Sequence, residues 1–257
     1  MYPIDMAGKN GVVLGVANDR SIAWAIARVL SQAGARLALT YQDERLKDRV
    51  TRLADTLENP LLVQCDATDD DQIAALFQAV EESFGDLSFL VHSIAYANRE
   101  DLGGNFSETS REGFRVALEV SAYSLLPLVK HAAPLMREGG SVVTMTFHAS
   151  QRVYPGYNVM GTAKAALEHE VRQLAAEFGE QGIRLNAIAA GPLETLAARG
   201  ISGFIDMRRH HAEKAAMKRN ITVEEVANAA LFLCSDLSTG ITGSVIPVDA
   251  GYHIMAV

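Results

Sequence analysis

Short apolar runs alternate with amphipathic segments along the 257-residue chain. The runs are rich in β-branched residues and predict strands at residues 11–16, 35–41, 61–66, 89–95, 141–146, 183–189 and 244–249. The spacing of apolar positions between them predicts helices at residues 22–30, 44–57, 70–84, 110–136 and 157–179. Continuous apolar strands that alternate with helices are typical of a parallel sheet covered on both faces.

The alternation therefore predicts an α/β fold. We expect one doubly wound, Rossmann-like domain over residues 1–257, with a seven-stranded parallel sheet and helices on both faces. No internal repeat, low-complexity tract or linker rich in proline and serine divides the sequence.

Composition and net charge limit the classes of molecule that the protein is expected to bind. Hydrophobic residues make up 49% of the chain and charged residues 21%, as in ordinary compact α/β proteins. A formal net charge of −8 at pH 7 provides no general attraction to nucleic acid or an anionic membrane, so neither is expected as a partner. The two cysteines, Cys65 and Cys234, do not form a disulfide or zinc pattern, and no metal is expected. The first ten residues do not have the pattern of a leader peptide, and a cytoplasmic location is expected.

Tyr157 and Lys164 lie seven residues apart at the start of a predicted helix. At about 100° per residue the two side chains project within roughly 20° of each other, toward one bound molecule. A positive charge beside a phenol makes its hydroxyl a better donor, which suits a developing oxyanion. The spacing alone is common by chance and more often reflects a packed tyrosine and a solvated lysine, so that interpretation stays open at this point.

The first strand-to-helix loop, residues 15–23, is where a doubly wound sheet usually holds the phosphates of a dinucleotide. This loop departs from the G-x-G-x-x-G fingerprint, because only Gly15 remains and Ser21 opens the helix. Ser21 can cap the helix and present its hydroxyl and backbone N–H to a pyrophosphate. It can equally be an ordinary helix cap with no ligand.

The ends of the second and third strands carry candidate contacts for adenosine. Gln42 can hydrogen-bond ribose hydroxyls, and Asp43 would repel a 2′-phosphate, which favours NAD over NADP. The nearby cations Arg45 and Lys47 weaken that preference. Asp66 can accept a hydrogen bond from the adenine amine or serve only to cap its loop.

Several long segments resemble one known family. They include G-V-A-N-D-R-S-I-A-W-A-I-A, V-H-S-I-A-Y-A, Y-N-V-M-G-T-A-K-A-A-L-E and I-R-L-N-A-I-A-A-G-P. Over nearly its whole length the chain resembles the short-chain dehydrogenase/reductase superfamily, and within it the NADH-type enoyl-acyl carrier protein reductases of bacterial fatty acid synthesis. The atypical phosphate loop separates this branch from the carbonyl-reducing branches.

The resemblance implies a reaction and a set of site residues. Hydride from NADH would reduce the trans-2 double bond of an enoyl thioester carried by acyl carrier protein, in the last step of the elongation cycle. Tyr157 would hydrogen-bond the thioester carbonyl and Lys164 would hold the nicotinamide ribose. The other implied cofactor contacts are Gly15, Ser21, Ile22, Gln42, Asp66, Ala67, Ile94, Leu193 and Thr195. Ala97 and Phe147 would line the substrate side, and the protein would be a homotetramer with residues 110–136 and 157–179 as interface candidates.

Three residues depart from the family pattern. Phe147 stands where most members of the branch carry a second tyrosine, so it provides an aromatic wall without a hydroxyl. His148 and Glu194 stand where leucine and arginine are usual, and Glu194 would disfavour a nearby pyrophosphate unless it points away.

Two further segments carry hypotheses. Residues 195–212 contain Gly200 and Gly203 as candidate hinges and resemble a mobile lid over the acyl chain. Residues 208–219 are basic and are either a docking patch for an acidic carrier protein or a solvated helix face.

Two other functions remain as alternatives. A carbonyl-reducing dehydrogenase would use Tyr157 as an acid, but Thr144 and Thr146 occupy the region where that branch carries a serine. A nucleotide-sensing regulator would keep the fold without the chemistry, and the intact pair of Tyr157 and Lys164 argues against it.

Overall fold

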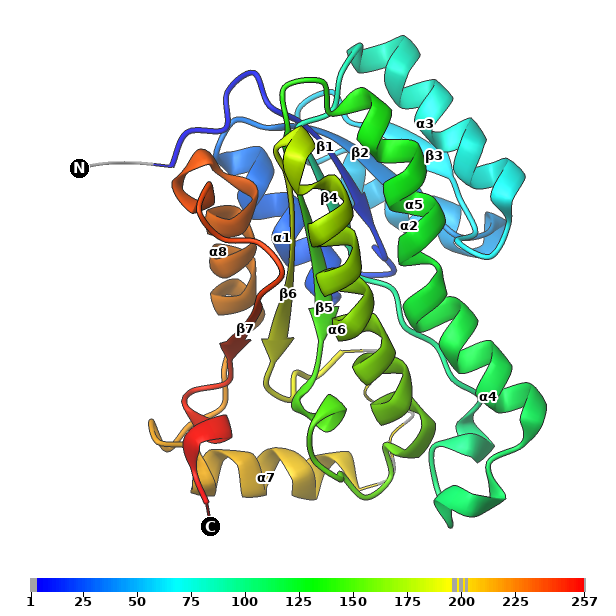
Figure 1. Ribbon diagram of the computed structural model, residues 1–257, viewed down its shortest axis with the longest axis vertical. Coiled ribbons are helices and arrows are strands. Elements are labelled where there is room, and N and C mark those ends of the chain that lie inside the picture. The colour runs from blue at the N-terminus through cyan, green and yellow to red at the C-terminus, as the bar shows by residue number, and fades with distance from the viewer. Residues whose placement is uncertain (1–3, 196–197, 199–200, 202, 257) are drawn as a thin grey trace.

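A seven-stranded parallel sheet forms the centre of the protein in the computed structural model, which describes residues 4–195, 198, 201 and 203–256 (Figure 1). The strands are β1 (Asn10–Leu14), β2 (Arg36–Tyr41), β3 (Leu61–Gln64), β4 (Phe89–His92), β5 (Gly140–Thr146), β6 (Ile183–Ala190) and β7 (Val245–Val248). Their order in the sheet is β3-β2-β1-β4-β5-β6-β7, and each neighbouring pair is parallel. The predicted doubly wound fold is confirmed, and strand order reverses between β1 and β4.

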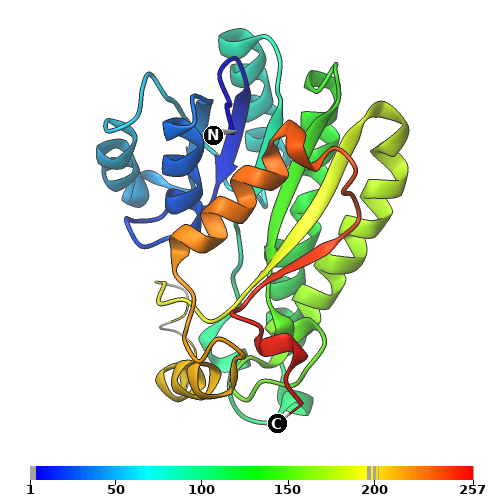
Figure 2. The same cartoon turned by 90° about the vertical axis from the view of Figure 1, so that its left-hand side faces the viewer.

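Helices cover both faces of this sheet (Figures 1 and 2). The α-helices of the described residues are α1 (Ile22–Gln32), α2 (Glu44–Ala54), α3 (Asp70–Phe84), α4 (Arg111–Leu118), α5 (Leu125–Ala132), α6 (Asn158–Phe178), α7 (Phe204–Lys214) and α8 (Val223–Cys234). One buried apolar cluster lies where α1, α2 and α8 pack on the sheet, and a second lies under α3, α5 and α6. The core is thus two layers, one on each face of the sheet.

Local sequence explains where several helices begin. Asp43 accepts hydrogen bonds from the backbone N–H groups of Arg45 and Leu46, which caps α2, and Asp69 caps α3 in the same way. Thr222 and Glu225 form a reciprocal capping box at the start of α8. These caps satisfy N–H groups that have no acceptor inside their own helix.

The helix expected at residues 110–136 is not one regular helix. A π-helical segment, Glu119–Tyr123, separates α4 from α5, and a 3₁₀ turn at Ala133–Leu135 follows. Within and after the π-helical segment, Ser121 accepts a hydrogen bond from the Tyr96 N–H, and Ser124 contacts His92. The extra residue in the π-helical turn brings the Ser121 hydroxyl to the loop after β4 and the Ser124 hydroxyl to β4 itself. Helical periodicity alone does not predict these two contacts.

Two strands, β3 and β4, end earlier than the sequence predicts, at the edge of the sheet where a ligand is expected. The third strand ends at Gln64 and the fourth at His92, so Asp66 and Ile94 lie in the loops beyond them. All of these loops lie at the carboxyl edge of the sheet, and α7 crosses below that edge (Figure 1). Part of the expected lid, residues 196–197, 199–200 and 202, lies outside the described residues, and the remainder includes most of α7. No helix in the described part of the chain is both long and apolar enough to cross a membrane.

Candidate active site

Tyr157 and Lys164 are placed by the first two turns of α6. Tyr157 is the residue before the helix begins, and Asn158 adopts a φ of +27° while its side-chain amide donates to the Gly103 carbonyl at 2.9 Å. Lys164 is 4% exposed, and its Nζ donates to the Met145 carbonyl of β5 at 2.8 Å. The entry to α6 is therefore tied to a neighbouring loop, and Lys164 is tied to the sheet.

Burial sets the protonation of both groups. It raises the pKa of Tyr157 above its ordinary value, so the phenol stays neutral near pH 7. Burial lowers the pKa of Lys164 to about 8, although the nearby Glu168 carboxylate acts in the opposite direction. The arrangement thus offers a neutral hydroxyl donor and an ammonium group that is still mainly protonated near pH 7.

The residues expected on the substrate side lie together. The Phe147 ring packs against Tyr157 with 5.0 Å between ring centroids, and against Tyr154 with 4.8 Å. Ala97 and Tyr157 both pack on a small buried cluster formed by Leu102, Ala117, Val159, Met160 and Ala163. Phe147 therefore completes an aromatic wall beside Tyr157, as expected from its side chain.

The loop after β1 closes tightly on the end of β4. Gly15 has a φ of +96°, and a Cβ at this position would lie 2.0 Å from the Ser93 carbonyl oxygen. A side chain here would fill the crevice where strand order reverses. Ile94 follows directly and lies half-buried on the core under α3 and α5.

Ser21 behaves differently from the expectation that its hydroxyl caps α1 or faces a pyrophosphate. It occupies the cap position, but its side chain makes no capping hydrogen bond. Instead the hydroxyl donates to the Asn18 carbonyl at 2.6 Å, and its backbone N–H donates to the same oxygen at 3.2 Å. Both groups close the loop on itself. A pyrophosphate would therefore have to be met by the next backbone N–H groups, those of Ile22 and Ala23.

The expected adenosine contacts from β2 and β3 meet directly. The Gln42 Nε2 donates to Asp66 Oδ2 at 3.1 Å, and Ala67 is buried beside them. Asp66 Oδ1 also accepts from the backbone N–H and hydroxyl of Thr68, at 3.0 and 2.8 Å, so Asp66 does cap its loop. Burial would raise the pKa of Asp66, but the hydrogen bonds from Thr68 and Gln42 outweigh it and hold the pKa below its usual value.

The two cations that weakened the preference for NAD are held by carboxylates. Arg45 contacts Asp43 at 2.6 Å, and Lys47 contacts Glu44 at 3.1 Å. The same Arg45 contact is the main reason that the pKa of Asp43 is lowered. Asp43 therefore stays negatively charged at the end of β2, where a 2′-phosphate would lie.

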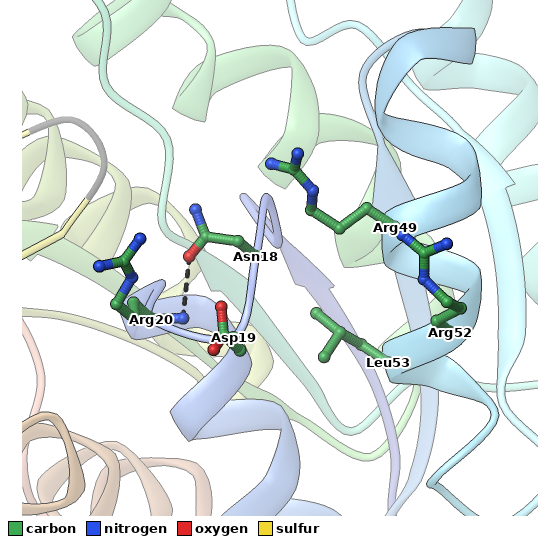
Figure 3. A pocket seen from close by; sticks show the side chains of 6 residues that line it. All are labelled: Asn18, Asp19, Arg20, Arg49, Arg52 and Leu53. Carbon is green, nitrogen blue, oxygen red and sulfur yellow. Dashed lines mark hydrogen bonds between the residues drawn. The ribbon is translucent and has the colours of Figure 1, made fainter.

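A basic groove of about 440 Å³ lies on the outer side of the phosphate loop (Figure 3). Its lining residues are Asn18, Asp19, Arg20, Arg49, Arg52 and Leu53. Figure 3 shows the Arg49 guanidinium directed from α2 toward Asn18 in the loop. The groove adds positive potential near the place expected for the pyrophosphate.

The segment after β6 turns Glu194 away from the sheet edge. Leu193 is buried, while Glu194 forms an ion pair of 3.0 Å with Arg208 of α7. The Thr195 N–H donates to the Leu193 carbonyl at 2.9 Å, and the Thr195 hydroxyl oxygen accepts from the Ala198 N–H at 3.2 Å. The ion pair draws the Glu194 carboxylate toward α7 and partly offsets its charge, which reduces the repulsion it would exert on a nearby pyrophosphate.

A family model described as Enoyl-(Acyl carrier protein) reductase matches residues 15–253. The chain belongs to the enoyl-acyl carrier protein reductase family. Curated relatives agree in sequence over nearly their whole lengths. The NADH enoyl-acyl-carrier-protein reductase FabI of Nostoc sp. is 49% identical over 98% of this chain and 99% of its own. The protein of that name from Bacillus subtilis is 48% identical over 98% of both chains.

Solved structures of enoyl reductases have the same fold. The Bacillus cereus enoyl-acyl carrier protein reductase with NADP⁺ and indole naphthyridinone superimposes with a TM-score of 0.96 at 48% identity, over 98% of this chain and 99% of that one. The Anaplasma phagocytophilum reductase in complex with NAD gives a TM-score of 0.96 at 42% identity, over 99% of this chain and 97% of that one.

This enoyl reductase has a buried histidine beside the candidate site that is not among the site residues expected from the sequence. His92 is fully buried, its Nδ1 lies 2.8 Å from the Thr144 hydroxyl and its Nε2 lies 2.9 Å from the Ser124 hydroxyl. Burial, assisted by the charge of Lys164, lowers the pKa of His92 to about 3. The histidine is therefore neutral and connects β4, β5 and the helical segment before α5. The sequence does contain one sign that His92 is buried, because the residue lies inside the apolar run of residues 89–95.

Proposed function

We propose that this chain reduces the trans-2 double bond of enoyl-acyl carrier protein thioesters with hydride from NADH, and that Tyr157 and Lys164 carry the chemistry. The observation that carries this proposal is the placement of Tyr157, Phe147 and Lys164 at the carboxyl ends of β4 and β5, in a chain of the enoyl reductase family. The reaction is the last step of the fatty acid elongation cycle.

The described residues fit a nicotinamide dinucleotide. The absence of a side chain at Gly15 lets the first loop approach the Ser93 carbonyl, and Gln42 with Asp66 offers hydrogen-bonding groups at the adenosine end. The predicted cofactor contacts stay Gly15, Ile22, Gln42, Asp66, Ala67, Ile94, Leu193 and Thr195. Ser21, by contrast, shapes the loop through its two hydrogen bonds to the Asn18 carbonyl. The negative charge of Asp43 favours NADH over NADPH.

Bound NADH would supply a hydride to the β-carbon of the enoyl thioester. The π pair of the trans-2 double bond would then form a double bond between the α-carbon and the carbonyl carbon, and the carbonyl π pair would move to the thioester oxygen. Tyr157 donates a hydrogen bond to that oxygen, which its neutral phenol can do near pH 7. Lys164 holds the nicotinamide ribose with its ammonium group. A proton added at the α-carbon then completes the saturated thioester. Phe147 provides a wall for the acyl chain and no second hydroxyl.

A carbonyl-reducing dehydrogenase fits the site less well. The Thr144 hydroxyl contacts His92, and the Thr146 hydroxyl donates to Glu168 at 2.8 Å. Both hydroxyls are therefore held inside the core and are not presented to a carbonyl substrate.

The partner is the acyl carrier protein that bears the substrate, and its docking on residues 208–219 is part of the proposal. The structure narrows the candidate patch. Arg208 pairs with Glu194, Arg219 pairs with Glu225, and His211 is buried against Tyr252. Arg209 likewise pairs with Asp206 at 2.6 Å, whereas no ion pair of Lys214 is found among the described residues. Charge reversal at Lys214 is thus a cleaner test than reversal at Arg208 or Arg209, and it should raise KM for a carrier-bound substrate but not for a coenzyme A thioester. Equal effects on both substrates would remove the docking role.

A homotetrameric assembly, a cytoplasmic location and a substrate lid over residues 195–212 belong to the same proposal. Apolar side chains support an interface on the α4 to α6 region, because Phe114 is 40% exposed and Tyr123 is 55% exposed.

The test follows NADH absorbance with an enoyl thioester, with acetoacetyl thioester and with NADPH in place of NADH. We expect NADH oxidation with the enoyl substrate alone. Turnover of only the ketoacyl substrate would move the protein to the carbonyl-reducing branch. Tight NADH binding without turnover would support the sensor.

A further inference from the structure

Glu168 is a buried carboxylate that the proposed mechanism does not use. It lies on α6 one turn beyond Lys164 and is 4% exposed. Its Oε1 accepts a hydrogen bond from the Thr146 hydroxyl at 2.8 Å. A charged group in a protein interior is costly unless other groups compensate it, so its position one turn from a buried ammonium group calls for an explanation.

Two consecutive residues of β5 hold the two opposite charges. Met145 accepts the hydrogen bond from Lys164 through its backbone carbonyl, and Thr146 donates to Glu168 through its hydroxyl. Residues four apart on a helix lie on the same face, about 40° from each other. The strand therefore fixes a negative charge beside Lys164 on the sheet-facing side of α6.

The remaining groups around Lys164 bring no second negative charge near pH 7. From β4, His92 is neutral, because its pKa is lowered to about 3. At the start of α6, Tyr157 is neutral, because burial raises its pKa. The helical segment before α5 contributes the hydroxyls of Ser121 and Ser124, which do not titrate in this range. Within the described residues, Glu168 is the one carboxylate that affects the charge of Lys164.

A small cavity of about 80 Å³, lined by both polar and apolar side chains, adjoins Glu168. Its polar lining consists of His148, Ser150, Gln151, Glu168, Asp249 and His253. The Ser150 hydroxyl is buried there without a hydrogen-bond partner in the described part of the protein. A cavity of this size with several polar groups in its wall can hold ordered water, which would hydrogen-bond to the Glu168 carboxylate. The Asp249 carboxylate is held by His253, whose ring lies at 3.0 Å and whose backbone N–H donates to it at 2.8 Å.

We propose that Glu168 is a positioning residue whose negative charge keeps Lys164 protonated, so that the ammonium group can hold the ribose of NADH. This role rests on the proposed function of Lys164. It predicts that the affinity for NADH decreases as pH rises through the deprotonation of Lys164, and that removing the Glu168 charge moves this decrease to lower pH.

The test measures NADH affinity by fluorescence titration between about pH 6 and about pH 9, for the wild type and for Glu168→Gln. Glutamine has nearly the same shape as glutamate, and its amide oxygen can still accept from Thr146. Loss of one opposite charge nearby shifts a pKa by about one unit, so the midpoint should fall by about one pH unit and the affinity at about pH 7.5 should fall about threefold.

Glu170→Gln is the matched control. Glu170 lies two residues further along α6, about 200° around the helix from Glu168, and is also partly buried. The same chemical change at this position should leave the pH midpoint of NADH binding unchanged. A similar shift in both variants would mean that the effect belongs to the helix as a whole and would overturn the proposal.

Two further results separate the possible failures. If Glu168→Gln does not fold, Glu168→Asp keeps the charge and should show the wild-type midpoint, whereas a midpoint displaced downward would overturn the role of the charge. An unchanged midpoint in a folded Glu168→Gln would also overturn it while leaving enoyl reduction untouched. Failure of the wild type to bind NADH would instead contradict the proposed function itself.

Discussion

At the scale of single residues, burial decides which groups around the candidate site carry charge. His92 has its pKa lowered and Tyr157 has its pKa raised, so both stay neutral near pH 7. Lys164 keeps its charge up to about pH 8 despite being buried. A neutral donor beside a retained positive charge is the combination that stabilises an enolate oxygen next to a ribose.

The lowered pKa of Lys164 also predicts how stability depends on pH. The pKa is about 8 in the folded protein against an ordinary value of 10.5, so the folded state disfavours the proton. Below about pH 8 the lysine is protonated in both states and destabilises the fold. As pH rises from about 8 to 10.5 this cost is relieved, by about 3 kcal/mol at most.

The measurement is urea unfolding of the cofactor-free protein at several pH values, for the wild type and for Lys164→Met. Subtracting the Lys164→Met curve removes the contribution of other groups that titrate at alkaline pH. The unfolding free energy of the wild type minus that of Lys164→Met should increase as pH rises from about 8 to 10.5. A pH-independent difference would show that Lys164 is not buried in its charged form.

At the scale of elements, the segments that follow β1 and β2 combine structural and binding roles. Gly15 allows the first loop to approach β4, and Asp43 both caps α2 and places a negative charge at the end of β2. Because Asp43 carries both a structural and a binding role, a well-chosen substitution can separate the two.

Asp43→Asn should separate the cap of α2 from cofactor choice. Asparagine caps helices about as well as aspartate, so stability should change little, whereas Asp43→Ala should cost about 1 kcal/mol. Both variants remove the charge and release Arg45, and both should lower KM for NADPH severalfold while leaving KM for NADH nearly unchanged. Glu44→Gln, which releases Lys47 from its ion pair, is the control for loss of a neighbouring carboxylate. Unchanged use of NADPH in both Asp43 variants would contradict this assignment.

Gly15→Ala should weaken the first loop. The added Cβ would meet the Ser93 carbonyl at 2.0 Å, and a φ of +96° is unfavourable for alanine. We expect a loss of stability of about 1–3 kcal/mol and at least tenfold weaker NADH binding, measured by denaturation and by fluorescence titration. Gly8→Ala, at a φ of +76° with no atom near its Cβ, controls for backbone strain alone. Equal losses in NADH affinity would argue against a specific role of the loop.

At the scale of the whole molecule, the sequence predicts the α/β sheet and much of the candidate site but not the contacts that support it. The strands and most helices follow from apolar periodicity, and the position of Lys164 near the start of a helix follows from it too, whereas Tyr157 precedes that helix and its backbone is not continuous with it. The partners of His92 and Glu168 come from other elements, so one-dimensional spacing does not reveal them. The same holds for Ser21, whose hydroxyl turns to the Asn18 carbonyl rather than to the helix.

The proposed assembly predicts the effect of charge on an exposed apolar face. Phe114 is exposed on α4, and Tyr123 is exposed on the π-helical segment between α4 and α5. Tyr123→Glu should lower the mass measured by light scattering from that of a tetramer to that of smaller species, because it would bury an unpaired charge at an interface. Ile205→Glu, on the exposed surface of α7, is the control. A monomeric wild type would contradict the assembly directly.

The measurement that tests the central claim most directly compares kcat for NADH-dependent reduction of a dodecenoyl thioester in the wild type and in Tyr157→Phe. The phenyl ring keeps the packing against Phe147 and removes only the hydroxyl. We expect kcat to fall about a hundredfold while NADH affinity stays within about twofold of the wild type, because the hydroxyl acts on the developing oxyanion. A Tyr157→Phe variant that reduces the enoyl thioester at the wild-type rate would contradict the account.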